Sequence, residues 1–206
     1  MRKRFPFGRF IGVIVFLSAR VAAAPQPLQI DEGRSQIEVR VTATAHAFTA
    51  RLDQFISVIM VDSEGGFVTG ATLTFHLTDV STGIRARDRA MQQWEEIERF
   101  PDGHFLLGSL APAGGGHFIA HGRMTLHGIS REVVFPVSIT TDRKIYAVDG
   151  TVALNTQDFG LPKIRKLGVL RVDSTVTVKF HLQGTLSVER SIQGSLPQPA
   201  TGNKVA

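Results

Sequence analysis

Imidazole side chains are the most suggestive chemical groups in this sequence. Three of the seven histidines, His117, His121 and His127, have spacings of four and six residues, which puts them on one face of an extended chain. Three imidazoles are enough to hold Zn²⁺ or Cu²⁺. Residues four apart on a strand are about 13 Å apart, however, whereas metal–nitrogen bonds measure about 2.1 Å. A metal site would need histidines from several neighbouring strands, and we predict that no metal is bound.

The other polar residues give little support for catalysis. The chain has no cysteine, which excludes thiolate nucleophiles, thiolate metal sites and disulfides together. Asp88 lies between Arg87 and Arg89, and Asp158 precedes Phe159-Gly160, so ion pairing, capping or a structural turn accounts for each carboxylate. The sequence contains neither a nucleophile elbow nor a phosphate-binding loop. We predict no catalytic residue and no enzymatic activity.

Residues 117–140 form the most regular pattern in the chain, two alternating runs that meet at Gly128. Each run keeps its apolar residues on a single parity, namely Phe118, Ala120, Met124 and Leu126, and then Val133, Phe135, Val137 and Ile139. Successive side chains of a strand point to opposite faces, so each run presents one apolar face. Gly128 tolerates the positive φ of a tight turn. The pattern predicts a β-hairpin whose inner face is an apolar wall.

Strand patterning recurs along the rest of the chain. Alternating or apolar runs occur at residues 37–42, 51–61, 67–78, 103–111, 144–154 and 172–188. With the two strands of the hairpin, this gives eight strands separated by turns rich in Gly and Asp. Such a series predicts a sandwich or a closed antiparallel barrel.

Residues 82–100 interrupt this series. They are rich in the helix formers Arg, Ala, Met, Gln and Glu, and Pro101 follows them, so we predict one short helix. Trp94, the only tryptophan, is expected to anchor this helix on the strands. The alternative is that the helix plugs or gates one mouth of a barrel.

The first 24 residues have the pattern of a secretory signal peptide. Arg2, Lys3, Arg4 and Arg9 precede an apolar run of about ten residues, and Ala22–Ala24 follow it. The run is well short of the roughly 20 residues that span a bilayer. We predict that residues 1–24 are removed and that the protein is periplasmic or otherwise exported. A retained membrane anchor is the alternative.

The distribution of charge argues against a nucleic-acid partner. Five of the 23 Lys and Arg residues, and none of the 18 Asp and Glu residues, lie in residues 1–24. The remainder is therefore balanced, whereas a nucleic-acid-binding surface needs a clustered excess of basic residues. Residues 189–206 are rich in Gly, Pro, Ser and Gln and are expected to be a disordered tail. Residues 25–188 then form one domain that is large enough for a core without disulfides.

Five short motifs in order resemble the YceI-like family. They are I-D-x-x-x-S at 30–35, T-G-x-x-x-R-D at 82–88, Phe100-Pro101, G-x-x-T-L-H-G at 122–128 and N-x-x-D-F-G at 155–160. The resemblance covers residues 30 to about 188. It implies an exported polyisoprenoid-binding protein with a lipocalin-like, eight-stranded antiparallel β-barrel, and hence an all-β fold with one short helix.

The resemblance agrees with what the strand patterns allow. An eight-stranded barrel is just wide enough to be filled by side chains or to hold one slender ligand. An apolar interior would take a polyisoprenoid, an isoprenoid quinone or a similar long-chain lipid, with no other cofactor. The predicted lining residues are Val39, Val41, Phe55, Phe75, Phe105, Met124, Phe135, Val152, Val178 and Phe180. The same residues would also fill a solid core, which leaves a protein-interaction or stress-response module as an alternative function. Monomer and homodimer, and transient contact with a membrane, are all compatible with the sequence.

Overall fold

Three of the long strands in this chain are each interrupted by a short break. The computed structural model describes residues 24–44, 46–62, 66–166 and 170–186. The strand β1 (Gln26–Ile30) leads through the 3₁₀ turn η1 (Glu32–Arg34) into β2 (Gln36–Ala43). The next pair, β3 (Ala47–Leu52) and β4 (Ile56–Val61), is separated by three residues. The third pair, β5 (Val68–His76) and β6 (Val80–Ser81), is separated by the 3₁₀ turn η2 (Leu77–Asp79).

The other five long strands are continuous. They are β7 (Asp102–Gly114), β8 (His117–Leu126), β9 (Ile129–Asp142), β10 (Ile145–Asn155) and β12 (Leu170–Leu186). A 3₁₀ turn η3 (Thr156–Phe159) follows β10, and the short β11 (Arg165–Lys166) pairs with β12. The helix α1 (Arg85–Trp94) lies between β6 and β7 in sequence.

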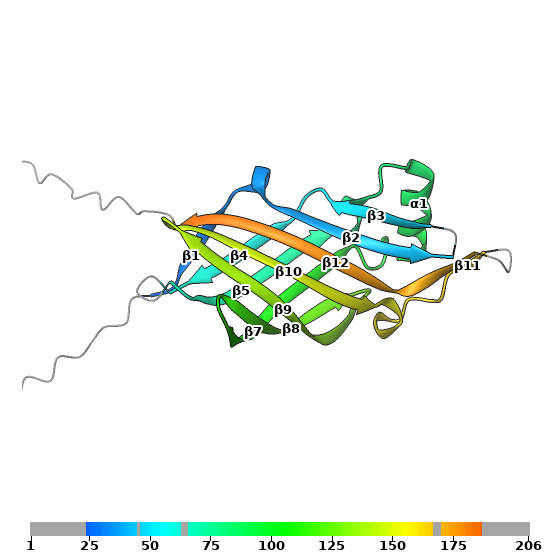
Figure 1. The fold of residues 1–206 in the computed structure, drawn as a ribbon. Helices are drawn as coiled ribbons and strands as arrows, with labels where there is room; N and C mark the ends of the chain where they lie inside the picture. The colour runs from blue at the N-terminus through cyan, green and yellow to red at the C-terminus, as the bar shows by residue number, and fades with distance from the viewer. Residues whose placement is uncertain (1–23, 45, 63–65, 167–169, 187–206) are drawn as a thin grey trace, which may run out of the picture.

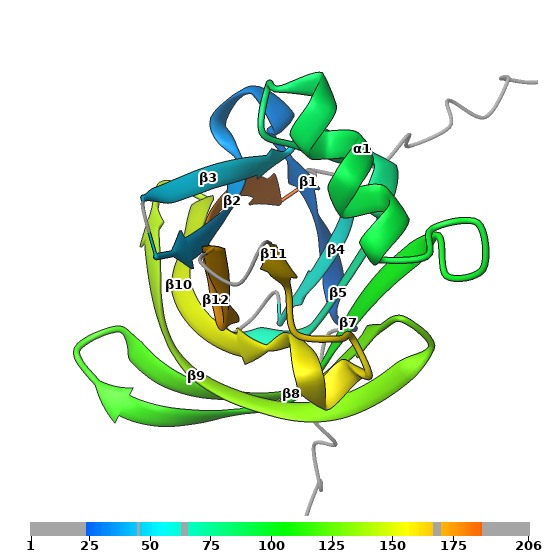
Figure 2. The same ribbon diagram turned by 90° about the vertical axis from the view of Figure 1, so that its right-hand side faces the viewer.

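All pairings between these strands are antiparallel, and they close into a ring. Neighbours follow the order β1, β4, β5, β7, β8, β9, β10 and β12, and β12 also pairs with β1. The strands β2, β3 and β6 extend the three broken strands beside β12 toward the α1 end (Figures 1 and 2). The prediction of an eight-stranded antiparallel barrel with one short helix is confirmed, and the sandwich alternative is wrong.

Several predicted boundaries differ from the structure. The run predicted as one strand at 51–61 is broken at Asp53, where the backbone N–H donates to the carbonyl of Asp79 at 2.9 Å. The helix predicted over 82–100 ends at Trp94, because Glu96 adopts a left-handed φ of 49°. The predicted signal peptide lies outside the described residues apart from its last position, residue 24, and the predicted tail lies wholly outside them.

The central hairpin has the turn that its sequence predicts. Both residues of the two-residue loop have positive φ, 50° at His127 and 71° at Gly128, as a type I′ turn requires. His127 is held in this conformation by its ring, which packs at a tilt against Phe100, with 4.2 Å between ring centroids, and bonds through Nδ1 to the Phe159 carbonyl at 3.2 Å. A carbonyl only accepts, so Nδ1 carries the proton.

Inward phenylalanine rings pack against glycines of adjacent strands. Phe75 reaches over Gly103, Phe105 over Gly122 and Phe180 over Gly150, and a Cβ at any of these glycines would lie within 3 Å of the ring. Phe75–Gly103 and Phe180–Gly150 are direct cross-strand partners. Each glycine therefore provides the space that allows a large ring to lie along the barrel wall.

These packing pairs predict a specific loss of stability. Gly150→Ala should lower the free energy of unfolding by about 1–3 kcal/mol, because the new methyl group overpacks against Phe180. Gly70→Ala is the matched control, since the atoms nearest to its Cβ, on Met60, lie at 3.9 Å. Urea titration measures both, and a second substitution, Phe180→Leu, should restore part of the loss. Equal stability of Gly150→Ala and Gly70→Ala would contradict this account.

Candidate functional site: an apolar cavity inside the barrel

The barrel encloses a cavity of about 120 Å³. All of the residues around it are apolar except Ser57 and Thr72. The lining comprises Ile37, Ser57, Ile59, Val68, Ala71, Thr72, Leu73, Phe105, Leu107, Leu110, Ala120, Met124, Val133, Phe135, Val137, Ile139, Val148, Val152, Leu154, Val178, Phe180 and Leu182. No charged side chain is among them, so the cavity is suited to a predominantly apolar ligand.

Strand register brings these side chains to a common interior. In β8 and β9, Ala120 lies opposite Phe135; in β10 and β12, Val152 lies opposite Val178. The ring of Phe135 lies 5.8 Å from that of Phe105 and 6.0 Å from that of Phe180. The cavity wall thus carries a chain of three aromatic rings from β7, β9 and β12.

Six of the ten predicted lining residues face this cavity, and four do not. The six are Phe105, Met124, Phe135, Val152, Val178 and Phe180. Val39 packs in the core, and Val41 pairs with Phe48 at the α1 end. Phe55 lies in the break between β3 and β4, and Phe75 lies against Gly103. Both phenylalanines line a separate cleft in the barrel wall.

Most of the lining residues that the prediction omitted lie on the same strand face, by alternation in the sequence, as residues that it included. Ile37 shares the parity of Val39, Leu73 that of Phe75, and Leu182 that of Phe180. Ser57 carries no such signal, because it lies in a run that reads as uniformly apolar. Its inward position follows from its pairing with Leu73.

The size of the cavity limits what it can hold without rearrangement. A dry cavity of roughly 150 Å³ lined by Leu, Ile and Phe accommodates benzene. A cavity of about 120 Å³ therefore has room for about one five-carbon isoprene unit. A longer chain can bind only if lining side chains move or if part of the chain lies outside this cavity.

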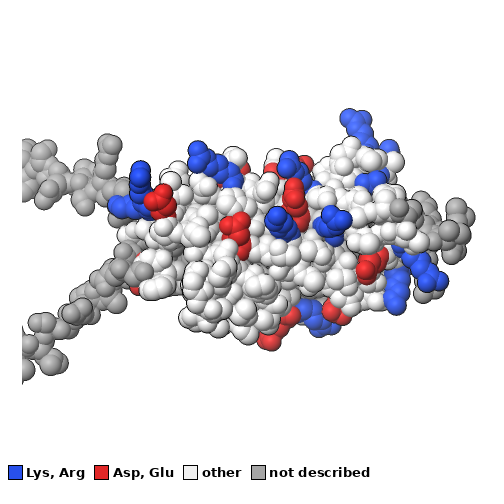
Figure 3. Space-filling view, in the orientation of Figure 1, with Lys and Arg blue, Asp and Glu red and all other residues white. Residues whose placement is uncertain are grey.

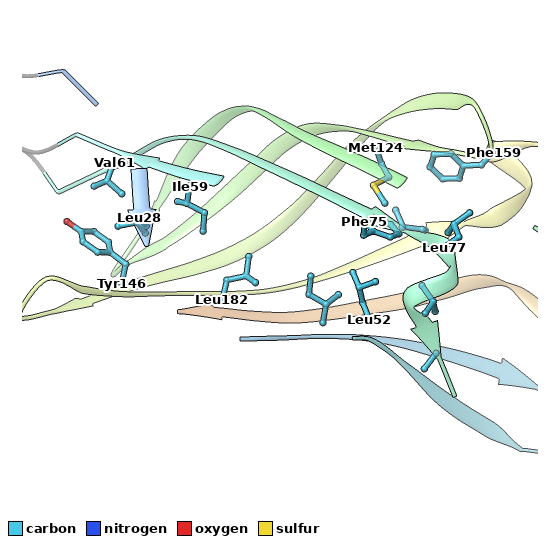
Figure 4. Packing of buried hydrophobic residues seen from close by; sticks show 14 residues of the cluster. Leu28, Leu52, Ile59, Val61, Phe75, Leu77, Met124, Tyr146, Phe159 and Leu182 are labelled. Carbon is cyan, nitrogen blue, oxygen red and sulfur yellow. The ribbon is translucent and has the colours of Figure 1, made fainter. Parts of the chain in front are cut away.

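Both ends of the barrel are occupied by buried side chains. Leu28, Val61 and Tyr146 lie at the end away from α1, and Phe75, Leu77, Met124 and Phe159 lie toward the other end (Figure 4). Phe159 is only 2% exposed and is followed by Gly160 with φ 78°. The Asp158-Phe159-Gly160 segment is thus a turn that inserts a ring into the core.

The helix α1 is fixed to the barrel by specific contacts. The indole N–H of Trp94 donates to the Pro162 carbonyl at 2.9 Å, and Met91 packs against the core. The loop before the helix is held by Asp88, which accepts from Thr82 N at 2.9 Å and from Thr82 Oγ1 at 2.6 Å. Slight burial raises the pKa of Asp88, but hydrogen bonds from Thr82 and Ser81 outweigh it and lower the pKa overall. Anchoring by Trp94 is therefore observed.

Glu95, directly after α1, has an unusual environment. It lies one helical turn after Met91, whose side chain packs against the core, and so shares its face. Burial raises the pKa of Glu95 to about 7. Within the described part of the chain, its Oε2 is buried without a hydrogen-bond partner.

The histidines are scattered over the barrel. His117 and His121 are exposed on β8, His76 pairs with Asp102, and His181 pairs with Asp149 at 2.8 Å. Among the residues that the structure describes, no three His, Cys, Asp or Glu side chains lie close enough to share a metal ion. The absence of a metal in the protein stays a prediction.

One outer face of the barrel is mixed in charge. On the face in Figure 3, Lys and Arg alternate with Asp and Glu, without an extended field of either sign. Within residues 24–44, 46–62, 66–166 and 170–186, no helix combines the length and apolarity needed to cross a membrane.

Comparison with known proteins identifies the same architecture. Residues 28–184 match the family described as the YceI-like domain. BcnA of Burkholderia cenocepacia has a similar structure, with a TM-score of 0.68 and 18% identity over 76% of this chain and 100% of BcnA. A polyisoprenoid binding domain from Saccharophagus degradans, implicated in plant cell wall breakdown, gives 0.60 and 17% over 77% and 97%. A Campylobacter jejuni YceI protein gives 0.58 and 15% over 87% and 100%. No curated protein sequence matches this chain.

The environment of Glu95 predicts a pH dependence of stability. Between the ordinary value of 4.5 and about 7, the folded protein binds a proton that the unfolded chain has lost. Stability should therefore fall as pH rises through this window, by up to about 3 kcal/mol. Glu95→Gln should abolish this fall and be more stable than the parent at about pH 8. The exposed Glu98→Gln is the control, and parallel curves for all three proteins in urea titrations would refute the assignment.

Proposed function

The chain belongs to the YceI-like family, and we propose that it is a lipid-binding protein that carries or sequesters one elongated apolar ligand in its barrel. A polyisoprenoid or an isoprenoid quinone has the required chemistry. The single observation that carries this proposal is the closed barrel around a cavity lined by apolar side chains. The structural similarity to a polyisoprenoid binding domain from Saccharophagus degradans supports the choice of ligand.

The energetics of burial fit this role. Each methylene removed from water contributes roughly 0.8 kcal/mol, so a long chain gains affinity without polar contacts. Rotation of Met124, which has three flexible side-chain bonds, is a means of enlarging the cavity for a chain longer than one isoprene unit. The lining contains the hydroxyls of Ser57 and Thr72 but no acidic or basic side chain to activate them, which favours binding over catalysis.

We further propose that the protein acts outside the cytoplasm. The support is the basic, apolar and small-residue order of residues 1–24. Isoprenoid lipids reside in membranes, and an exported carrier with a balanced surface charge would approach a membrane only transiently.

The export proposal is tested at the N-terminus. Protein recovered from the cell envelope of an expressing bacterium should begin near Pro25, because cleavage follows the small residues Ala22–Ala24. Mass spectrometry of the intact protein measures this. Recovery of protein that still begins at Met1 or Arg2 would refute removal of the leader.

The ligand proposal is tested by a charge placed inside the barrel. Met124→Lys should reduce co-purifying lipid at least tenfold, because an ammonium group against the ligand chain is costly to desolvate. Leu106→Lys is the matched control, since Leu106 is 56% exposed on the outer face of β7. Organic extraction with mass spectrometry measures the lipid, and thermal melting reports folding.

The outcomes distinguish a barrel that holds a ligand from a barrel that is packed with side chains. A folded Met124→Lys protein without lipid, beside a loaded parent and a loaded Leu106→Lys protein, supports a ligand-holding interior. A parent that never carries or takes up lipid, with a Met124→Lys variant that fails to fold, means a packed barrel and overturns the proposal.

A further inference from the structure

The three strand breaks lie beside one another and leave a cleft in the barrel wall. This side cleft measures about 830 Å³. It is lined by residues of the β1–β2, β3–β4 and β5–β6 breaks, including Ser35, Gln54 and Asp79, and by neighbouring strand residues such as Gln36 and Thr74. The pairing of Arg51 with Ser81, and the bond from Asp53 N to Asp79 O, hold two of the breaks together. The cleft is therefore part of the folded wall and not a gap between loops.

The side cleft and the interior cavity have one lining residue in common. Ile37 lines both spaces and is 4% exposed. Across β2 and β12 it pairs with Phe180, whose ring lines the interior cavity. Both barrel ends carry buried side chains (Figure 4). A route between the two spaces would therefore pass the side chain of Ile37.

The side cleft also supplies the room that the interior lacks. The interior holds about one isoprene unit, whereas an elongated lipid needs several times that volume. The cleft has an apolar floor of Ile37, Leu52, Phe55 and Phe75, so a chain that passes Ile37 would remain against apolar side chains.

The rim of the side cleft selects against an anionic head group. Three carboxylates, Glu32, Asp53 and Asp79, line it together with two basic residues. The two basic residues are already paired, Arg51 with Glu38 at 3.5 Å and His76 with Asp102. A phosphate would meet like charge there, whereas a hydroxyl can donate to a carboxylate.

We propose that the side cleft binds the uncharged, hydroxyl-bearing head of an isoprenoid alcohol whose chain passes Ile37 into the barrel. This rests on the proposed function and names the ligand class within it. The carboxylates accept the hydroxyl proton, the apolar floor covers the first isoprene units, and the interior takes the end of the chain. Ile37 acts as the specificity-determining residue that controls the passage.

Head-group selectivity tests the carboxylate rim. Equilibrium dialysis with radiolabelled geranylgeraniol and geranylgeranyl phosphate should give at least tenfold tighter binding of the alcohol. Replacing two of the rim carboxylates, Asp53→Asn with Asp79→Asn, should strengthen binding of the phosphate. The ratio of the phosphate Kd to the alcohol Kd should therefore fall at least threefold. Asp142→Asn is the control, because Asp142 lies outside the cleft and its side chain is 84% exposed. Equal affinities for the two ligands in the parent overturn the proposal.

Two experiments test the passage, namely substitutions at Ile37 and the protection of an introduced cysteine from maleimide. Ile37→Trp should weaken geranylgeraniol binding at least tenfold, and Ile37→Ala should speed its uptake. Since the chain has no cysteine, Gln54→Cys introduces one label site in the cleft, and saturating geranylgeraniol should slow its maleimide reaction at least fivefold. Asp142→Cys should be unaffected.

The possible failures are distinguishable. If geranylgeraniol binds and Met124→Lys abolishes binding, but the Ile37 variants and the Gln54→Cys label do not respond, this inference is overturned and the proposed function stands. If the parent binds neither geranylgeraniol nor geranylgeranyl phosphate and carries no lipid, both are overturned. Unfolding of Ile37→Trp leaves the decision to the label, which needs no change at Ile37.

Discussion

The structure depends on the closure of the sheet by β12. This strand pairs with β10 from Thr175 to Thr185 on one edge, and with β2 and then β1 on the other. Because the strand runs the length of the barrel, it is the common partner of the first and last parts of the ring (Figure 1). Closure leaves the ring without a free edge and forces every strand to turn one parity inward. The apolar cavity is a consequence of that constraint.

Closure does not by itself decide whether the interior is filled. The free volume inside depends on the position of the large side chains. Here the rings of Phe75, Phe105 and Phe180 lie against glycines on adjacent strands, and so along the barrel wall. Rings that lie along the wall leave space near the axis, which Leu and Met side chains only partly occupy. The buried residues Tyr146 and Phe159 lie toward the two ends of the barrel (Figure 4).

Parity explains what the sequence could predict and what it could not. Alternation at residues 117–140 and 172–188 determined the faces of β8, β9 and β12, and with them the placement of Met124, Phe135 and Phe180 on the cavity. It failed at Phe55, because nothing in an apolar run reveals that Asp53 bonds across to Asp79 and interrupts the strand. The helix end was also missed, since it depends on the left-handed φ of Glu96. Breaks and cavities arise from contacts between distant segments, which local patterns do not record.

The glycine–phenylalanine pairs have an evolutionary consequence. Since the Phe180 ring occupies the volume that a side chain at Gly150 would need, neither position is free to drift alone. A larger residue at 150 is tolerated only with a smaller one at 180, so the two positions should covary among homologous chains. The same reasoning applies to Phe75 with Gly103 and to Phe105 with Gly122. Lineages that exchange the members of a pair would keep the fold while redistributing interior volume between strands, and so diversify the shape of the lumen.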